Sequence, residues 1–314
     1  MVMRAGQLYY PDMIRRLLLG LFLLPQLLNA AVDEPSVRLP GYVLQLPDSV
    51  KSVLIAETET ATLHRYSVDM HGLLLREDRP MSIGQQGVGK QRTGDQRTPL
   101  GIYFVMEELD TSKLHEKYGP VAFPLDYPNA WDEANQKTGY GIWIHGVAPG
   151  SGPRPERDTD GCIALPNDEL LSLEPHLTPL QTPVIVTRGI QTFSDEDAVA
   201  IRSELLAALA LWTSSYRDGD WHRFLSLYTQ DFVYRGMNRE EWSAYRIQTL
   251  GSRRIDDFTV DDVLLIADPE DEGLYLSRFR QLVNEDGRKV ATTKRLYWRK
   301  LPDGNLKIVA EDNG

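Results

Sequence analysis

Ile142-Trp143-Ile144-His145-Gly146 and Thr159-Asp160-Gly161-Cys162-Ile163 are the two segments that decide the interpretation of this chain. Cys162 is the only cysteine among 314 residues, so it has no partner for an intramolecular disulfide. It follows His145, which ends an apolar strand-like run, by 17 residues. A lone cysteine in a glycine-rich turn downstream of such a histidine is a candidate nucleophile with its base. Gly161 permits a tight turn, and the backbone N–H groups of that turn are candidates for holding an oxyanion. The alternative is a buried, inert thiol.

The amino terminus has the features of an export signal. Arg15 and Arg16 precede an apolar stretch over residues 17–28, and small residues at 30–31 follow. This order predicts a signal peptide over residues 1–31 and a periplasmic location for the rest of the chain. An uncleaved anchor is the alternative. The formal net charge of −11 argues against nonspecific nucleic-acid binding, because phosphate contacts need Lys and Arg.

The first half of the chain is rich in short apolar runs typical of strands. Residues 32–50 contain three prolines and are interpreted as a lead-in to a domain over 51–189. Strands are expected at Val53–Ala56, Thr62–Tyr66, Ile102–Val105, Ile142–Ile144 and Val184–Val186, with the first two paired. One short helix is expected after Asn167 as its N-cap, with Leu170, Leu171 and Leu173 facing inward.

A second domain is expected over 197–314, after a linker at 190–196. Ser194 can cap a helix in which apolar residues recur at helical spacing, from Ile201 to Tyr216. Further helices are expected near 221–228 and 239–250, and the acidic run from Asp268 to Glu272 is expected to be a solvated turn. Strands are expected at Phe258–Ile266, Leu274–Val283, Lys289–Arg299 and Leu306–Ala310, so the domain is α+β.

The region from 51 to 188 resembles the YkuD-type L,D-transpeptidase family. The family signature is His-Gly, a variable loop, and then Ser/Thr-x-Gly-Cys followed by a hydrophobic residue, as found here from His145 to Ile163. Upstream, Gly87-Val88-Gly89-Lys90 and Thr98-Pro99-Leu100-Gly101-Ile102-Tyr103 are similar to the family's approach to the active site. The resemblance implies a mostly-β, β-sandwich-like catalytic domain that acts on peptidoglycan stem peptides.

The same resemblance implies a mechanism for these residues. Cys162 is expected to attack the carbonyl between a diamino acid and the terminal D-alanine, and His145 is expected to be the general base, oriented by a backbone carbonyl. The thioester then passes to an amine of a neighbouring stem or to water. Gly146 and Gly161 match the structural glycines, and Thr159 matches the family's Ser/Thr. No cofactor or metal is expected, and the other histidines have no metal-ligand spacing.

Two positions depart from the family pattern. Asp160 stands where many members have histidine, and Ala164 stands where many have an arginine that helps to organise the substrate site. Arg154 and Arg157, in the loop between His145 and Cys162, are candidates for a replacement charge. Together with Thr159, Asp160 and Tyr140, they form the expected substrate-binding set.

Residues 196–314 resemble a nuclear transport factor 2-like (SnoaL-like) cone, in which helices pack on a curved antiparallel sheet. The resemblance rests on Ala210-Leu211-Trp212, Gly219-Asp220-Trp221, Tyr228, Asp231-Phe232 and Glu241-Trp242. Such a domain occurs after the YkuD-type domain in L,D-carboxypeptidases that help to set cell shape in helical bacteria. A binding or assembly role is expected for it, with a second copy of the chain or another protein as partner.

Three functions follow from these observations. The leading hypothesis is a cysteine acyltransferase of the L,D-transpeptidase family with an amine acceptor. The close alternative is an L,D-carboxypeptidase that uses water as acceptor, which Ala164 and the C-terminal cone favour. A non-enzymatic wall-binding scaffold is the third, and the presence of His145 and Cys162 argues against it.

Overall fold

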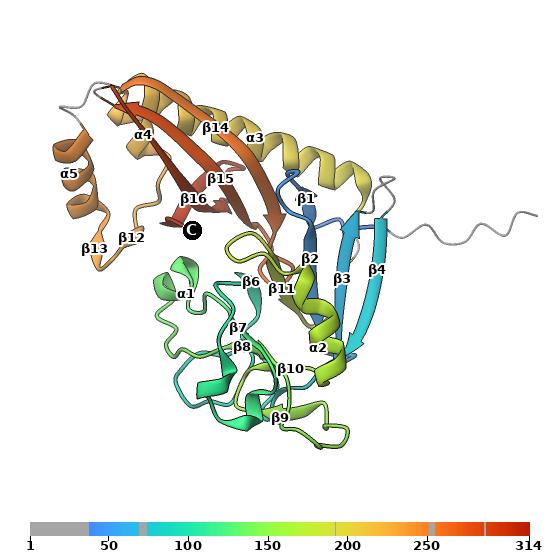
Figure 1. Ribbon diagram of the computed structural model, residues 1–314. Coiled ribbons are helices and arrows are strands. Elements are labelled where there is room, and N and C mark those ends of the chain that lie inside the picture. Colours follow the sequence, from blue (N-terminus) through green and yellow to red (C-terminus); the bar gives the residue numbers. More distant parts are fainter. Residues whose placement is uncertain (1–37, 69–73, 192, 251–254, 286) are drawn as a thin grey trace, which may run out of the picture. The chain divides into compact units, whose positions relative to one another are not determined.

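The structure is a computed structural model that describes residues 38–68, 74–191, 193–250, 255–285 and 287–314 (Figure 1). The predicted signal peptide over residues 1–31 lies outside the described residues. No helix within the described ranges is long and apolar enough to span a membrane.

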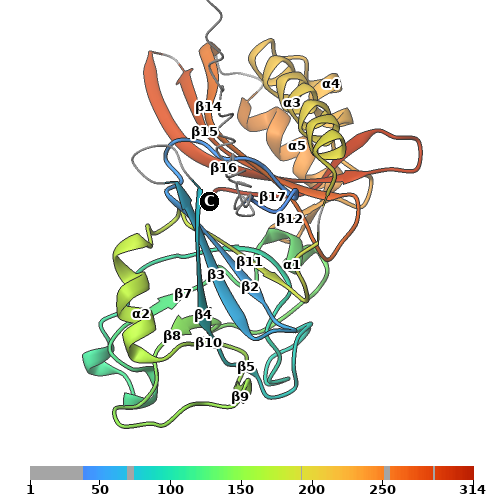
Figure 2. The ribbon, with the colours of Figure 1, turned by 90° about the vertical axis from the view of Figure 1, so that its right-hand side faces the viewer.

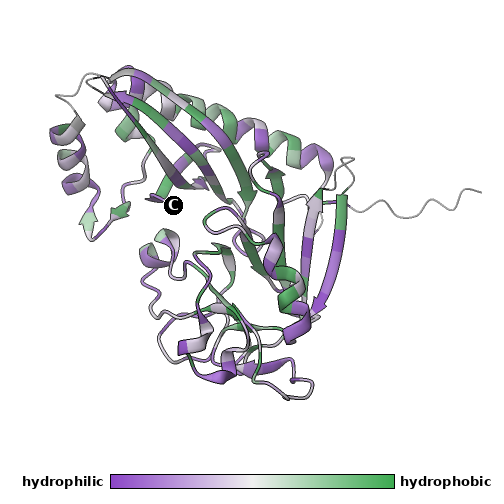
Figure 3. Cartoon of the chain, in the orientation of Figure 1, coloured by the Kyte–Doolittle hydropathy of each residue, from purple (hydrophilic) through white to green (hydrophobic). Residues whose placement is uncertain are grey.

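The half of the chain over residues 51–189, called the catalytic half after the activity that its sequence implies, is built on a five-stranded sheet. The strand order of this sheet is β4-β3-β2-β11-β6. Its strands are β2 (Ser52–Glu57), β3 (Thr62–Val68), β4 (Leu74–Pro80), β6 (Gly101–Phe104) and β11 (Pro183–Thr187). The predicted pairing of the first two strands is confirmed, since β2 and β3 pair antiparallel. The central strand β2 is hydrophobic, whereas the edge strand β4 is hydrophilic over most of its length (Figure 3). Charged side chains on an edge strand discourage pairing with another chain.

Both faces of β2 are buried, because successive side chains of a strand point to opposite faces. Leu54 and Ala56 pack in the core of the catalytic half. Val53 and Ile55 pack in the hydrophobic cluster that also contains the core of the second domain. This double burial explains why β2 is a continuous apolar run rather than an alternating one.

The same half also contains shorter elements. A three-stranded sheet has the order β10-β8-β7, and β5 pairs with β9. These strands are β7 (Ala122–Pro124), β8 (Trp143–His145), β10 (Ile163–Ala164), β5 (Ile83–Gly84) and β9 (Arg157–Thr159). The helical segments are η1 (Thr111–Lys113), η2 (Glu116–Tyr118), α1 (Ala130–Ala134), α2 (Asn167–Leu173) and η3 (Glu174–His176).

Helix α2 differs from its prediction in two details. Asn167 is its first helical residue rather than its N-cap, and Pro166 occupies the cap position without a side-chain hydrogen bond. The Asn167 side chain is instead engaged with the backbone of Val147. Leu170 and Leu173 are fully buried as predicted, but Leu171 is 46% exposed. The inward prediction for Leu171 was therefore wrong, since a helical position one residue from Leu170 points away from the shared face.

The second domain confirms the predicted order of helices followed by an antiparallel meander (Figures 1 and 2). Its sheet has the order β1-β14-β15-β16-β17, and α3 packs against β14 and β1. The Ser194 side chain caps α3 by accepting from the Asp197 N–H. The elements are α3 (Asp195–Arg217), α4 (Trp221–Ser226), β12 (Val233–Tyr234), β13 (Met237–Asn238), α5 (Arg239–Leu250), β14 (Ile255–Ala267), β15 (Leu274–Glu285), β16 (Arg288–Lys300) and β17 (Leu306–Asp312).

The lead-in contributes a strand that the sequence did not predict. Strand β1 (Val43–Gln45) pairs antiparallel with β14, with Val43 opposite Ile266. The first described residues of the chain thus form an edge of the second domain's sheet, before the chain enters the catalytic half. The two halves are tied together through this strand as well as through the segment before α3.

The acidic run after β14 was wrongly expected to be a solvated turn. Asp268 is buried, and its carboxylate accepts from the Glu270 N–H at 2.8 Å. The Glu270 carboxylate accepts from the hydroxyl of Thr187, at the end of β11, and from Arg188. The run therefore anchors the second domain on the catalytic half, a role that only the three-dimensional pairing reveals.

Candidate active site

His145 and Cys162 are brought together by two neighbouring strands. Strands β8 and β10 pair in parallel, with Ile144 opposite Ile163 and His145 opposite Ala164. The Leu165 N–H donates to the His145 carbonyl at 2.9 Å and extends this pairing. Cys162 immediately precedes β10, so the nucleophile candidate enters the same small sheet whose neighbouring strand ends in the histidine.

The His145 ring is set up as a base. Its Nδ1 lies 2.6 Å from the Gly146 carbonyl oxygen. A carbonyl only accepts, so Nδ1 carries the proton and Nε2 is left as the basic nitrogen. Burial lowers the pKa of His145 to about 4, an effect that the Gly146 hydrogen bond opposes and that the positive charges of Arg154 and Lys117 reinforce. The ring is therefore neutral at physiological pH and ready to accept a proton.

Cys162 is a buried thiol in its resting state. Its side chain donates to the Gly141 carbonyl at a Sγ–O distance of 3.3 Å. Burial raises the pKa of Cys162 to about 11, and the negative charge of Asp160 adds to the rise, while a backbone hydrogen bond with Trp143 opposes it. Both the thiol and the imidazole are therefore neutral at rest, which excludes a stable thiolate–imidazolium ion pair in the resting protein.

The turn that presents Cys162 is held by Thr159. The Thr159 hydroxyl donates to the Cys162 carbonyl at 2.7 Å and accepts from the Gly161 N–H at 3.1 Å. Because the Gly161 N–H is used inside the turn, it is not the oxyanion donor that the sequence suggested for this segment. Thr159 itself is buried. It therefore positions the nucleophile's backbone from within the protein.

Gly161 is required by this turn on two grounds. Its φ is +125°, a conformation that side-chain-bearing residues rarely adopt. A Cβ at this position would also lie 2.7 Å from the Arg97 carbonyl oxygen, which packs against the turn. The loop that carries Arg97 thus forms the wall on which the catalytic turn rests.

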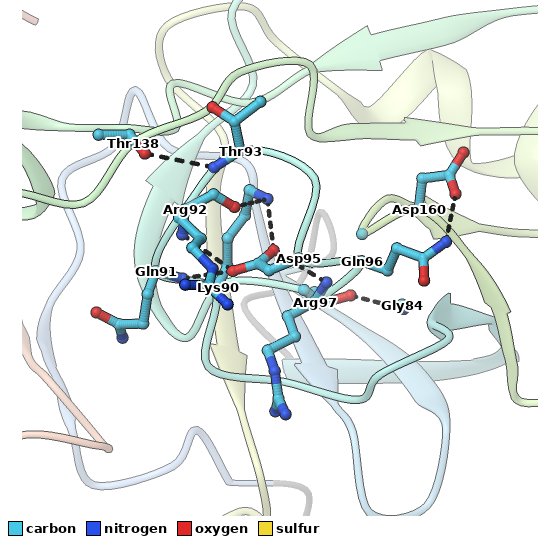
Figure 4. Close-up of polar contacts among 12 residues, drawn as sticks. Gly84, Lys90, Gln91, Arg92, Thr93, Asp95, Gln96, Arg97, Thr138 and Asp160 are labelled. Carbon is cyan, nitrogen blue, oxygen red and sulfur yellow. Dashed lines mark hydrogen bonds and ion pairs between the residues drawn. The ribbon is translucent and has the colours of Figure 1, made fainter.

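That wall is built around a buried ion pair (Figure 4). Lys90 is almost fully buried, and its Nζ donates to the Asp95 carboxylate at 2.8 Å and to the Arg92 carbonyl at 3.1 Å. The Asp95 carboxylate also accepts from the backbone N–H groups of Gln91, Arg92 and Arg97. Burial raises the pKa of Asp95, but these hydrogen bonds outweigh it and lower the pKa to about 2. The buried Lys90–Asp95 pair therefore fixes the backbone of the glycine-rich approach segment, which is a structural role.

The backbone after His145 is fixed by Asn167. Its amide oxygen accepts from the Val147 N–H at 2.8 Å, and its amide nitrogen donates to the Val147 carbonyl at 3.0 Å. A Cβ on Gly146 would lie 2.3 Å from that amide oxygen. Gly146 is thus needed so that Asn167 can approach the chain and bond Val147, the residue after the carbonyl that orients His145.

The predicted substrate-binding residues differ in exposure, and the cavity that Arg154 lines does not include Cys162 or His145 in its lining. Tyr140 is 84% exposed, and Arg157 and Asp160 are also exposed. Arg154 donates to the carboxylate and the carbonyl of Asp158. Arg154 and Ala164 line the same cavity of about 620 Å³, together with Met81, Val147 and Leu165. The position that lacks the family's arginine thus shares a cavity with the loop arginine proposed to replace it.

Sequence reasoning missed two residues beside the base. The Tyr118 ring stands edge-on to the His145 ring with centroids 5.2 Å apart, and its carbonyl accepts from the Gly146 N–H. Lys117 lies over the Tyr118 ring and within 4.0 Å of Asp160. Neither residue belongs to a motif, and no spacing in the sequence connects η2 with the catalytic strands.

The comparisons identify the class of each domain. Residues 54–186 match the model of the L,D-transpeptidase catalytic domain called YkuD, and residues 204–312 match that of the Cds6 C-terminal NTF2-like domain. The chain therefore contains a YkuD-type L,D-transpeptidase catalytic domain followed by an NTF2-like domain, as the sequence resemblance implied. Members of this family act on peptidoglycan stem peptides.

Two solved structures share both domains with this chain. One is the helical cell shape determining protein Pgp2 from Campylobacter jejuni, with 25% identity, a TM-score of 0.72, and coverage of 87% of this chain and 95% of that one. The other is Bd1075 from Bdellovibrio bacteriovorus, with 24% identity, a TM-score of 0.69, and coverage of 88% and 98%. No curated protein sequence matches the chain.

Proposed function

We propose that this protein is a periplasmic cysteine acyltransferase that cleaves the bond between the diamino acid and the terminal D-alanine of peptidoglycan tetrapeptide stems. The observation that carries the proposal is that Cys162 immediately precedes β10, the strand that pairs in parallel with the strand ending in His145. The Nδ1 bond to the Gly146 carbonyl, which leaves Nε2 as the base, supports it. The likeness to Pgp2 supports a part in determining cell shape.

The first half-reaction forms a thioester. The Cys162 Sγ attacks the scissile carbonyl carbon while its proton passes to His145 Nε2. The tetrahedral intermediate collapses, the carbon–nitrogen bond breaks, and the imidazolium returns the proton to the departing amine of D-alanine. Because burial disfavours the charged forms of both Cys162 and His145, thiolate and imidazolium exist only along the reaction path.

The second half-reaction transfers the acyl group. An amine of a neighbouring stem attacks the thioester carbon, loses its proton to His145, and displaces Sγ, which regains the proton. Water in the same role gives a tripeptide stem and makes the enzyme an L,D-carboxypeptidase. The cavity in which Ala164 replaces the usual arginine favours this alternative, because a group that helps to organise the substrate site is missing there. Arg154 is the proposed substitute.

The NTF2-like domain is proposed to bind or assemble rather than to catalyse. Its aromatic side chains form a packed core, with Trp212, Phe224, Phe232 and Trp242 at most 1% exposed. A second copy of the chain or another protein is the proposed partner.

The test is incubation of the purified full-length protein with disaccharide tetrapeptide, followed by mass spectrometry of the products. A crosslinked dimer supports the transferase, and tripeptide alone supports the carboxypeptidase. If the wild-type protein yields neither product, the enzymatic proposal fails and the scaffold hypothesis takes its place. Cys162→Ala is expected to abolish D-alanine release. Ser203→Ala, an exposed change on α3, is the control and is expected to keep wild-type activity.

A further inference from the structure

Lys117 lies on the segment that supports the catalytic base. Its Nζ lies 5.1 Å from the centroid of the Tyr118 ring, within the range of a cation–π contact. That ring stands against His145, and the Tyr118 carbonyl holds the Gly146 N–H at 3.0 Å. The Lys117 ammonium is therefore tied to the same short segment that packs on the histidine.

The other neighbour of Lys117 belongs to the nucleophile's turn. The distance from Nζ to the Asp160 carboxylate is 4.0 Å, and Asp160 precedes Cys162 by two residues. The Asp160 carboxylate also accepts from the Gln96 amide at 3.3 Å (Figure 4). The ammonium thus contacts both the segment that packs on His145 and the turn that carries Cys162. Consistently, its charge lowers the pKa of both Cys162 and His145, although burial has the larger effect on each.

This ion pair is weak enough to exchange partners. The Lys117 side chain is 52% exposed and that of Asp160 is 70% exposed. An exposed pair at the distance limit of a salt bridge contributes little to stability. A carboxylate on an incoming substrate can therefore replace Asp160 at little cost.

The substrate of the proposed reaction offers such a carboxylate. The terminal D-alanine ends in a carboxylate that is separated by a single Cα from the nitrogen of the bond to be cleaved. An enzyme that removes only the terminal residue must distinguish the chain end from an internal peptide bond, and the free carboxylate is what marks that end. A cation that lies near both the base and the nucleophile's turn, as Lys117 does, meets this requirement.

We propose that Lys117 binds the carboxylate of the terminal D-alanine and is the specificity-determining residue that restricts cleavage to stem ends. This inference rests on the proposed function and extends it to the recognition of the leaving group. It assigns a role to a residue outside the family motifs. It also gives the departure at Asp160 a function, namely as the counter-ion that the substrate displaces.

The test compares two substrates that differ only in that carboxylate. One is disaccharide tetrapeptide with a free terminal carboxylate, and the other is the same molecule with a terminal amide. The kcat/KM for release of D-alanine or of D-alanine amide is measured for the wild type, Lys117→Ala, Lys117→Arg and the control Lys113→Ala. Lys113 is an exposed lysine on η1 whose ammonium lies 3.7 Å from Asp110.

The wild type is expected to prefer the free carboxylate by about 5-fold, the ratio that corresponds to about 1 kcal/mol for a pair with a half-exposed ammonium. Lys117→Ala is expected to lose that preference, mainly through a higher KM for the free acid, with little change for the amide. Lys117→Arg and Lys113→Ala are expected to keep it. Equal losses on both substrates in Lys117→Ala, or a wild type without preference, would overturn the inference.

A binding experiment separates this inference from the proposed function. Calorimetric titration of the free acid and the amide is carried out on Cys162→Ala with and without Lys117→Ala. Tighter binding of the free acid that disappears with Lys117→Ala supports the carboxylate site even if the wild type releases no D-alanine. Equal binding of the two ligands to Cys162→Ala rejects the site even if the wild type is an active enzyme.

Discussion

Replacement of Thr159 by valine tests whether one hydroxyl holds the catalytic turn. Valine keeps the shape of threonine but removes the oxygen that joins the Gly161 N–H to the Cys162 carbonyl. Both groups then remain without a partner beside a side chain that is 5% exposed. A buried polar group that loses its partner costs about 1–3 kcal/mol. With two such groups, Thr159→Val is therefore expected to lower the free energy of unfolding by about 2–6 kcal/mol.

The effect on activity is expected to exceed what lost stability alone explains. The turn sets the position of Sγ relative to the scissile carbonyl, and a misplacement of about 1 Å can cost roughly 100-fold in rate. Thr159→Val is expected to lower kcat for D-alanine release by about 100-fold under conditions where the protein stays folded, with a small change in KM. Thr159→Ser keeps the hydroxyl and is expected to stay within about 5-fold of the wild type.

The assay combines urea unfolding with steady-state release of D-alanine. Thr213→Val is the matched control, because the Thr213 hydroxyl also donates to a backbone carbonyl, that of Leu209, but lies on α3 in the other domain. It is expected to cost about 1 kcal/mol of stability without loss of activity. A folded Thr159→Val variant with wild-type kcat would refute the reasoning that this hydroxyl positions the nucleophile.

Two further predictions concern pH. Burial lowers the pKa of His145 to about 4 and raises that of Cys162 to about 11. The kcat/KM of the wild-type enzyme should therefore rise as the pH increases through about 4 and stay constant from about pH 6 to pH 9. A bell-shaped pH profile centred near neutrality would contradict the neutral resting pair. Burial also raises the pKa of Asp268 to about 7, so its protonated form favours the folded state and that contribution is lost as the pH rises from about 4 through 7. The Asp268→Asn variant retains the oxygen that accepts from the Glu270 N–H. It should be more stable than the wild type at pH 8, by at most about 4 kcal/mol, but not at pH 4. Urea midpoints that shift equally at the two pH values would show that Asp268 does not titrate in this way.

The parts of the fold that the sequence predicted are those with a local cause. Strand β2 is a continuous apolar run because both of its faces are buried, and that run is visible without knowledge of its neighbours. Helix α3 was predicted because Leu205, Leu209, Trp212 and Tyr216 recur at helical spacing, and all four are buried. The domain that contains Cys162 and His145 was recognised because their flanking glycines form short motifs, and the catalytic roles of the two residues stay a prediction.

The missed features depend on partners that are far away in sequence. Strand β1 becomes a strand only by pairing with β14, more than 200 residues later in the chain. The acidic run at 268–272 has the composition of a solvated turn, but Glu270 meets Arg188 and Thr187 from the catalytic half. The composition of a segment shows how polar it is. It does not show which oppositely charged residue will lie next to it in the folded protein.

The charges around the candidate nucleophile also differ from the family pattern. Strand β10 carries Ala164 where other members place an arginine, and the turn before Cys162 carries the acidic Asp160. Positive charge reaches the site from loops instead, from Lys117 beside the base and from Arg154 at the cavity that Ala164 lines. Each of these cations has an exposed or partly exposed carboxylate partner that a substrate can displace, Asp160 for Lys117 and Asp158 for Arg154. Under the proposed function, these charges are available to a substrate carboxylate because their present partners are exchangeable. This arrangement suits an enzyme that must recognise the free end of a stem peptide before Cys162 attacks.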